Sequence, residues 1–160
     1  MKITLRSEAF ANSRPIPIKY TGEGEDSSPP LRWDNVPAAA KQLALVCDDP
    51  DAPTRDPWVH WVIYAIPPDT RALAEGIPAE PRLKSPAGAM QGKNSWPAGR
   101  TVGYRGPMPP PGHGLHHYHF KIMALDQAFD LEPGLDKAAL LKAIKGHVLA
   151  EGLLIGTYKR

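Results

Sequence analysis

The sequence predicts a mostly antiparallel β fold with one late helix packed on the sheet. The first observation is the composition, with 19 prolines and 14 glycines among 160 residues. Proline removes a backbone donor and clashes inside helices, so this composition excludes a helical bundle. The second is a series of short apolar or alternating segments, which are typical of strands. The third is one apolar stripe with helical spacing near the C-terminal end.

Four segments in the first half are typical of strands. Ile3 and Leu5 alternate with polar neighbours and predict the first strand. Residues 16–20 predict a second strand, which their proline restricts to a sheet edge. Residues 43–47 and 58–66 are continuous apolar runs, typical of strands that are buried on both faces.

A long irregular segment separates these strands from the next one. Residues 67–115 contain most of the proline and glycine and almost no hydrophobic periodicity. Such a stretch inside a compact domain is more often functional than a linker, although a solvated connector is the other interpretation. Residues 118–125 then predict a further strand.

The C-terminal part contains the one clear helix pattern. Residues 136–149 predict a helix with Asp136 as its N-cap and an apolar stripe on one face. Gly152 suits the region of its C-cap, and residues 153–155 predict a last strand.

Length, charge and cysteine content restrict the class of protein. The length predicts a single domain over residues 1–160. The net charge is +2 and no run of Lys and Arg exceeds two residues, so we expect no nucleic-acid partner. The single cysteine, Cys47, allows no internal disulfide and favours the cytoplasm. The N-terminal residues lack the apolar core of a signal peptide, and no apolar run is long enough to span a bilayer, so we expect no stable membrane insertion.

Strand parity identifies two candidate histidines, because successive side chains in a strand point to opposite faces. His116 shares a face with Tyr118 and other apolar residues, whereas His117 and His119 share the wetter face. On the earlier strand, His60 lies among apolar neighbours on either face, and parity places it with Trp58, Val62, Tyr64 and Ile66. Two inward histidines beside loops rich in proline could converge on one site.

Several interpretations of these residues remain open. An inward histidine is often a core residue bonded to the backbone, but beside Asp49 or Asp51 it could also act as a proton donor that binds anions. His117 and His119 could both reach a metal ion, yet His116 faces away and a zinc site needs three or four ligands, so we expect no metal. Cys47 is predicted to be an inert buried thiol. The aspartates could also be simple turn formers.

Two motifs resemble the signatures of the phosphatidylethanolamine-binding protein family. The segment Asp49-Pro50-Asp51-Ala52-Pro53, followed by Trp58-Val59-His60-Trp61, resembles the first signature. Residues 103–120, which include Gly-His-Gly-Leu-His-His-Tyr, resemble the second in the form of the bacterial branch rather than the Raf kinase inhibitor branch. The resemblance extends over nearly the whole chain, and together the motifs are highly specific.

The resemblance implies a fold and a site. The fold is mainly β: a large antiparallel β-sheet packed with a smaller β-sheet, with peripheral helices including a C-terminal helix. The site is a small anion pocket at the rim of the large sheet, without a cofactor, which in relatives accepts phosphate or a phosphoethanolamine head group. It also implies a cis Ala52–Pro53 bond. By motif matching, the ligand-binding residues are Asp49, Asp51, Pro53, His60, Pro110, Gly112, His116 and Tyr118.

Three classes of function follow from this resemblance and from the residues. The first is a non-enzymatic protein that binds a small anion or a phosphorylated head group. The second is a hydrolase that uses His60 or His116 with Asp49 as an acid–base pair and water as the nucleophile. The third is a regulator or inhibitor of a kinase or protease, which would present the stiff loop 105–112. Bacterial relatives are often dimers, so a homodimer is a further expectation.

Overall fold

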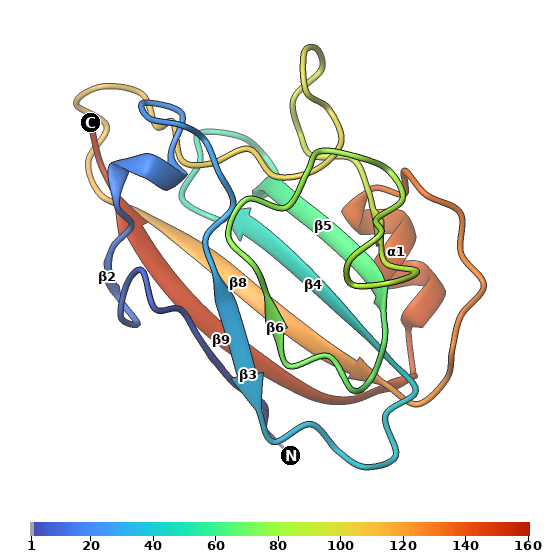
Figure 1. Cartoon of the computed structure of the whole chain (residues 1–160). Coiled ribbons are helices and arrows are strands. Elements are labelled where there is room, and N and C mark those ends of the chain that lie inside the picture. The colour runs from blue at the N-terminus through green and yellow to red at the C-terminus, as the bar shows by residue number, and fades with distance from the viewer. Residues whose placement is uncertain (1) are drawn as a thin grey trace.

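The structure, a computed structural model, describes residues 2–160 and consists of two β-sheets and one α-helix (Figure 1). The large sheet has six strands, which in spatial order are β2 (Arg14–Pro15), β9 (Val148–Tyr158), β8 (His116–Leu125), β4 (Gln42–Asp49), β5 (Trp58–Ile66) and β7 (Met90–Gln91). The small sheet contains β1 (Thr4–Arg6), β3 (Leu31–Asp34) and β6 (Ala72–Leu73). All pairings are antiparallel except that of β2 with β9. The predicted fold class is confirmed.

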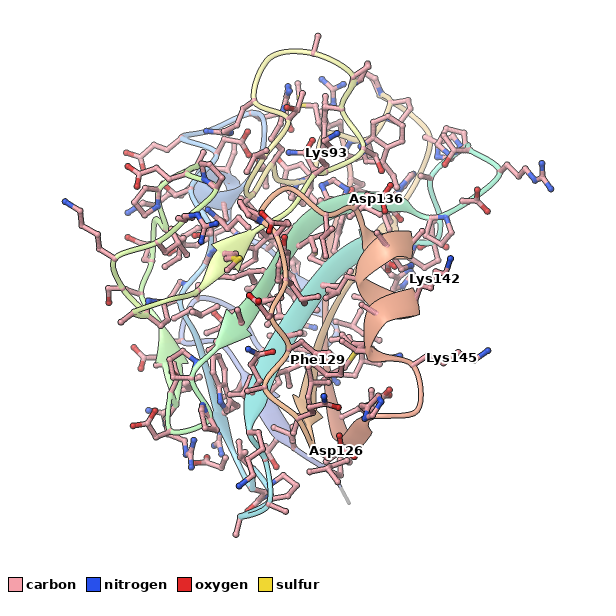
Figure 2. All side chains as sticks on the ribbon, turned by 90° about the vertical axis from the view of Figure 1, so that its right-hand side faces the viewer. Lys93, Asp126, Phe129, Asp136, Lys142 and Lys145 are labelled. Carbon is pink, nitrogen blue, oxygen red and sulfur yellow. The ribbon has the colours of Figure 1, made fainter. Side chains whose placement is uncertain are left out.

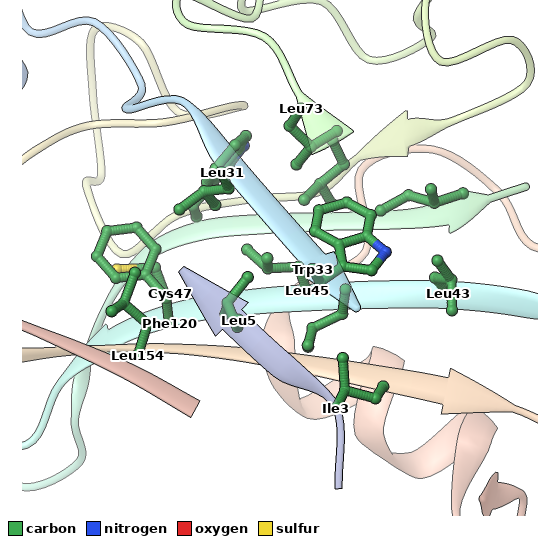
Figure 3. Packing of buried hydrophobic residues seen from close by; sticks show 14 of the residues in the cluster. Ile3, Leu5, Leu31, Trp33, Leu43, Leu45, Cys47, Leu73, Phe120 and Leu154 are labelled. Carbon is green, nitrogen blue, oxygen red and sulfur yellow. The ribbon is translucent and has the colours of Figure 1, made fainter. Parts of the chain in front are cut away.

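The main core lies between the two sheets (Figure 3). Leu5 and Trp33 from the small sheet pack toward Leu45 and Phe120 of the large sheet, and all four side chains are buried. Each such side chain contributes about 1.5–3 kcal/mol through removal of its apolar surface from water. The indole Nε1 of Trp33 donates to the carbonyl of Thr70 at 2.9 Å, so the largest of these side chains is also satisfied as a donor.

The opposite face of the large sheet is covered by helix α1 (Lys137–Ile144) (Figure 2). Leu140 and Ile144 are its buried residues, and they pack on a second cluster that contains Val62 and Met123. Lys142 points away from the sheet into solvent. The helix begins as predicted, because the Asp136 carboxylate accepts a hydrogen bond from the backbone N–H of Ala139 at 2.8 Å.

The strands predicted at 43–47, 58–66 and 118–125 are confirmed, and the end of the helix is not. The helix stops at Ile144, because Gly146 adopts a left-handed φ of 84° and the chain turns into β9. Gly152 is therefore not a cap. It lies within β9, where a Cβ atom would stand 2.3 Å from the carbonyl oxygen of Ile3.

The strand predicted at residues 16–20 is also wrong. Pro17 begins a turn of 3₁₀ helix, η1 (Ile18–Tyr20), in which the Tyr20 N–H donates to the Pro17 carbonyl at 3.0 Å. The edge strand is instead β2, just before this turn. Among residues 2–160, no helix has the length and apolar character needed to cross a membrane.

Candidate ligand pocket

A pocket of about 270 Å³ opens at one end of the large sheet, where β4 ends and β5 and β8 begin. Strand ends supply its polar floor. Part of its wall comes from residues 50–57, here called the aspartate loop, and from residues 105–115, here called the proline-rich loop. The lining residues are Asp49, Ala52, Pro53, Thr54, Trp58, His60, Trp96, Met108, Pro109, Pro110, His116 and Tyr118. None of these is a lysine or arginine, so any positive charge on the lining must come from histidine.

A β-bulge brings His60 to this pocket. Asp48 pairs with Val59 and Cys47 pairs with Trp61, so His60 is the extra residue between two pairs. The bulge resets the alternation of side chains, and His60 consequently lies beside Tyr118, with ring centroids 5.1 Å apart. The predicted face shared by His60, Val62 and Tyr64 is therefore wrong, because Val62 and Tyr64 pack in the cluster under α1.

A chain of three hydrogen-bonded side chains runs from the floor of the pocket to the proline-rich loop. The Nδ1 of His116 lies 2.6 Å from Oδ2 of Asp49, and both residues are buried, at 2% and 3% exposed. The Nε2 of His116 lies 2.6 Å from Nδ1 of His113, which is exposed on the proline-rich loop. Since a carboxylate only accepts, Nδ1 of His116 carries the proton toward Asp49. In that tautomer Nε2 of His116 is an acceptor, and Nδ1–H of His113 donates to it.

The second histidine offers a different group to a ligand. The Nδ1–H of His60 donates to the carbonyl of Arg105 at 2.6 Å. Burial lowers the pKa of His60, while the Arg105 carbonyl and nearby carboxylates oppose this shift. The ring is therefore neutral near pH 7. Within residues 2–160, Nε2 of His60 bonds no other group. Since every buried side-chain nitrogen or oxygen in this range has a partner, Nε2 of His60 is an accessible atom, and it faces the pocket as an acceptor.

The walls of the pocket are largely aromatic. Trp96 meets Trp58 edge-on at 5.4 Å between ring centroids and meets His60 at 5.1 Å. The guanidinium of Arg105 lies 4.5 Å from the centre of the Trp96 ring and holds that ring from outside the pocket. At the floor, burial and the charge of Asp49 raise the pKa of Tyr118, which keeps its hydroxyl protonated.

The structure gathers most of the predicted site residues and leaves two aside. Asp49, Pro53, His60, Pro110, His116 and Tyr118 line the pocket. Asp51 instead lies next to the pocket and bonds His117. Its Oδ2 accepts from the backbone N–H of His117 at 2.8 Å and lies 2.7 Å from Nδ1 of the His117 ring. Although partial burial acts in the opposite direction, these bonds lower the pKa of Asp51. Gly112 lies on the loop above, with its N–H bonded to the carbonyl of Arg160 at 3.1 Å.

A further expectation concerns the Ala52–Pro53 bond in the aspartate loop. The expected cis Ala52–Pro53 bond is wrong, since the one cis bond among residues 2–160 precedes Pro86. The loop turns without it, because Asp49 Oδ1 accepts from the N–H of Asp51 and the Thr54 N–H donates to the Ala52 carbonyl.

Two pocket residues, Trp96 and Met108, were not predicted from the sequence. They reach the pocket from the irregular segment, where no periodic pattern points to them.

Metal and thiol chemistry find little support in the arrangement of side chains within residues 2–160. Within residues 2–160, no group of three or more His, Cys, Asp and Glu side chains is placed to hold a metal ion. Cys47 is buried beneath the sheet, and burial raises the pKa of its thiol well above its usual value. A thiol in that state is a poor nucleophile.

The comparisons with known proteins agree with one another. The family model described as phosphatidylethanolamine-binding protein matches residues 6–159. A protein of Methanothermobacter thermautotrophicus, named only as a UPF0098 protein, is 51% identical over 158 residues and covers 99% of both chains.

Two solved structures share the fold over the full chain. A phosphatidylethanolamine-binding protein homologue from Chlamydia trachomatis has a TM-score of 0.87 and 39% identity, covering 99% of this chain and 98% of its own. Escherichia coli YbcL, described as a member of the mammalian family, has a TM-score of 0.89 and 28% identity, covering 100% and 99%. Relatives therefore occur in both archaea and bacteria.

Proposed function

Because the chain belongs to the phosphatidylethanolamine-binding protein family, we propose that its pocket binds a small phosphorylated anion or head group. The observation that carries this proposal is the buried pair of Asp49 and His116, joined at 2.6 Å on the pocket floor. The pair fixes the ring so that Nε2 points toward the pocket. When Nε2 also carries a proton, it donates that proton in a hydrogen bond to an anion.

A monoprotonated phosphate monoester fits the two histidines better than a simple anion does. Its charged oxygens accept from Nε2–H of His116, and its remaining P–OH donates to the neutral Nε2 of His60. The aromatic walls at Trp58 and Trp96 suit the organic part of a head group, and a ligand ammonium would gain from the ring faces. With no Lys or Arg in the lining, we expect binding to be weak.

Calorimetric titration tests this proposal with four probes: phosphate, phosphoethanolamine, ethanolamine and sulfate. We expect phosphate and phosphoethanolamine to bind, phosphoethanolamine more tightly, and sulfate to bind less well because it carries no proton for His60. His116→Gln should abolish binding. His147→Ala is the matched control, since His147 is a part-exposed histidine paired with Asp126 at 2.8 Å, outside the pocket lining. Equal binding by wild type and His116→Gln would refute the proposal.

The same geometry favours one alternative, a hydrolase. The hydrogen-bonded chain of Asp49, His116 and His113 resembles the arrangement in which a carboxylate orients a general base. Water would be the nucleophile, because the one threonine of the lining, Thr54, already donates to the carbonyl of Asp56 at 2.6 Å. Turnover of esters or phosphoesters with a bell-shaped pH profile that is lost in His116→Gln would establish the enzyme. No turnover on either class would exclude it.

A regulatory role is the third part of the proposal. Met108 and Leu115 are 44% and 50% exposed on the proline-rich loop at the pocket mouth, so this loop could contact a kinase or protease while the pocket is occupied. Replacing residues 107–112 by Gly and Ser should then abolish inhibition of such a partner. Unchanged inhibition would place the contact elsewhere.

We also propose a cytoplasmic location, in keeping with the single buried thiol.

A further inference from the structure

The Nε2 nitrogen of His116, which the proposed ligand would contact, is covered by another side chain of the same protein. The Nδ1 of His113 lies 2.6 Å from Nε2 of His116, and the ring centroids are 4.8 Å apart. Nδ1 of His116 is already bonded to Asp49. A ligand that binds through His116 must therefore take the position that His113 now holds.

The loop that carries His113 is built so that the ring can leave. Gly112 and Gly114 flank it with φ of 75° and 98°, and a Cβ at either position would meet nothing within 4 Å. All residues from 111 to 115 are exposed, so the ring can turn into solvent at the cost of its contact with His116. The base of the loop is fixed, because the Nε of Arg160 donates to the carbonyl of Pro109 at 2.6 Å.

We infer that His113 is a gate of the pocket, a side chain that competes with the ligand for Nε2 of His116. This inference deepens the proposed function and rests on it for the identity of the ligand. In the closed state His113 donates to this nitrogen. In the open state the ring of His113 leaves, Nε2 takes up a proton from solvent, and Nε2–H donates to a phosphate oxygen. The gate lowers affinity and favours ligands whose interaction with His116 exceeds one imidazole hydrogen bond.

The first test needs no ligand. Diethyl pyrocarbonate acylates an imidazole nitrogen only when its lone pair is accessible. At pH 7, peptide mapping by mass spectrometry should show His116 modified roughly two- to tenfold faster in His113→Ala, the range set by loss of one ordinary hydrogen bond. The rate at His147 in the same sample is the internal reference. An unchanged rate at His116 would overturn the gate.

The second test measures phosphate binding by calorimetry in wild type, His113→Ala and the control His147→Ala. The gate predicts roughly two- to tenfold tighter binding in His113→Ala alone. Weaker binding would overturn it, because His113 would then be a ligand donor. If His116 becomes more reactive but neither protein binds phosphate or phosphoethanolamine, the gate stands and the proposed ligand class fails. The open surroundings of both flanking glycines make a folding failure of the alanine variant unexpected.

Discussion

The carboxylate of Asp49 and the imidazole of His116 form a buried hydrogen bond of 2.6 Å between residues 67 positions apart. Strand pairing creates this contact. Asp48 is the partner of His119 across β4 and β8, so the end of one strand stands beside the start of the other. The polar floor of the pocket is thus a consequence of sheet register, and its stability should depend on both side chains.

The first prediction concerns Asp49→Asn. The two oxygens of Asp49 accept from the N–H of Asp51 and from Nδ1–H of His116. An amide has one acceptor, so one buried donor loses its partner, and the free energy of unfolding should fall by about 1–3 kcal/mol. Urea denaturation measures this change. Asp51→Asn is the control, since its half-exposed pair with His117 should contribute less than about 1 kcal/mol. Equal losses in both variants would contradict the account.

The second prediction is a pH dependence caused by His60. Burial lowers the pKa of this residue in the folded state below its unfolded value of about 6.5, so the unfolded chain takes up the proton first. The resulting contribution to stability is present above that pH and is lost as the pH falls below it, by at most about 1.4 kcal/mol per pH unit. Wild type should therefore lose more stability than His60→Asn between pH 7 and pH 5.

His60→Asn is suitable for this comparison because its amide can still donate to the carbonyl of Arg105. All other histidines are common to both proteins, so the difference between the two unfolding curves isolates His60. Parallel curves across this pH range would show that His60 is not held neutral.

The third prediction concerns Trp96→Ala. Trp96 covers His60 and Trp58 from the irregular segment, and Arg105 lies against its outer face. Its removal should widen the pocket and weaken phosphoethanolamine binding more than phosphate binding, because the aromatic wall contacts the organic part of the ligand. Tryptophan fluorescence should respond to phosphoethanolamine in wild type and much less in the variant. An equal loss of affinity for both ligands would show that the aromatic wall does not distinguish phosphoethanolamine from phosphate.

The fourth prediction concerns Gly106→Ala at the base of the proline-rich loop. A Cβ here would stand 2.1 Å from the carbonyl oxygen of Tyr20, and the Gly106 N–H bonds Asp26 at 2.6 Å. The backbone must move, so we expect a loss of about 1–3 kcal/mol in thermal or urea unfolding. Gly22→Ala is the control, because its Cβ would meet the flexible Met108 sulfur at 2.9 Å. A Gly106→Ala variant as stable as this control would show that the loop adjusts freely.

Much of the sheet could be predicted from the sequence because its strands are long and continuously apolar. The segments at 43–47 and 58–66 needed no tertiary information, and the burial of His116 followed from simple alternation in β8. The strand β3 was missed although Leu31 and Trp33 alternate with polar neighbours, because four residues are a short run and Pro29 and Pro30 directly precede it. Its burial becomes evident only when the small sheet packs on the large one.

The pocket was predictable only where the chain is regular. His60 was selected although its predicted face was wrong, because the bulge beside Cys47 is a local exception to alternation. Trp96 and Met108 come from a segment without periodicity. Their neighbours are held by distant parts of the chain, since the Ser95 N–H donates to the Val59 carbonyl and the Gly22 N–H donates to the Pro107 carbonyl. His113 was not predicted as a site residue, because its contact with His116 depends on the fold of a glycine-flanked loop.

The most direct test of the central claim is a ¹⁵N NMR titration of the six histidine side chains with phosphate and with phosphoethanolamine. We predict that the ring nitrogens of His116 and His60 shift with both ligands, that His113 loses its bond to His116, and that His147 does not respond. The response should disappear in His116→Gln. Shifts confined to exposed histidines, or the same shifts in His116→Gln, would contradict the assignment of this pocket as the ligand site.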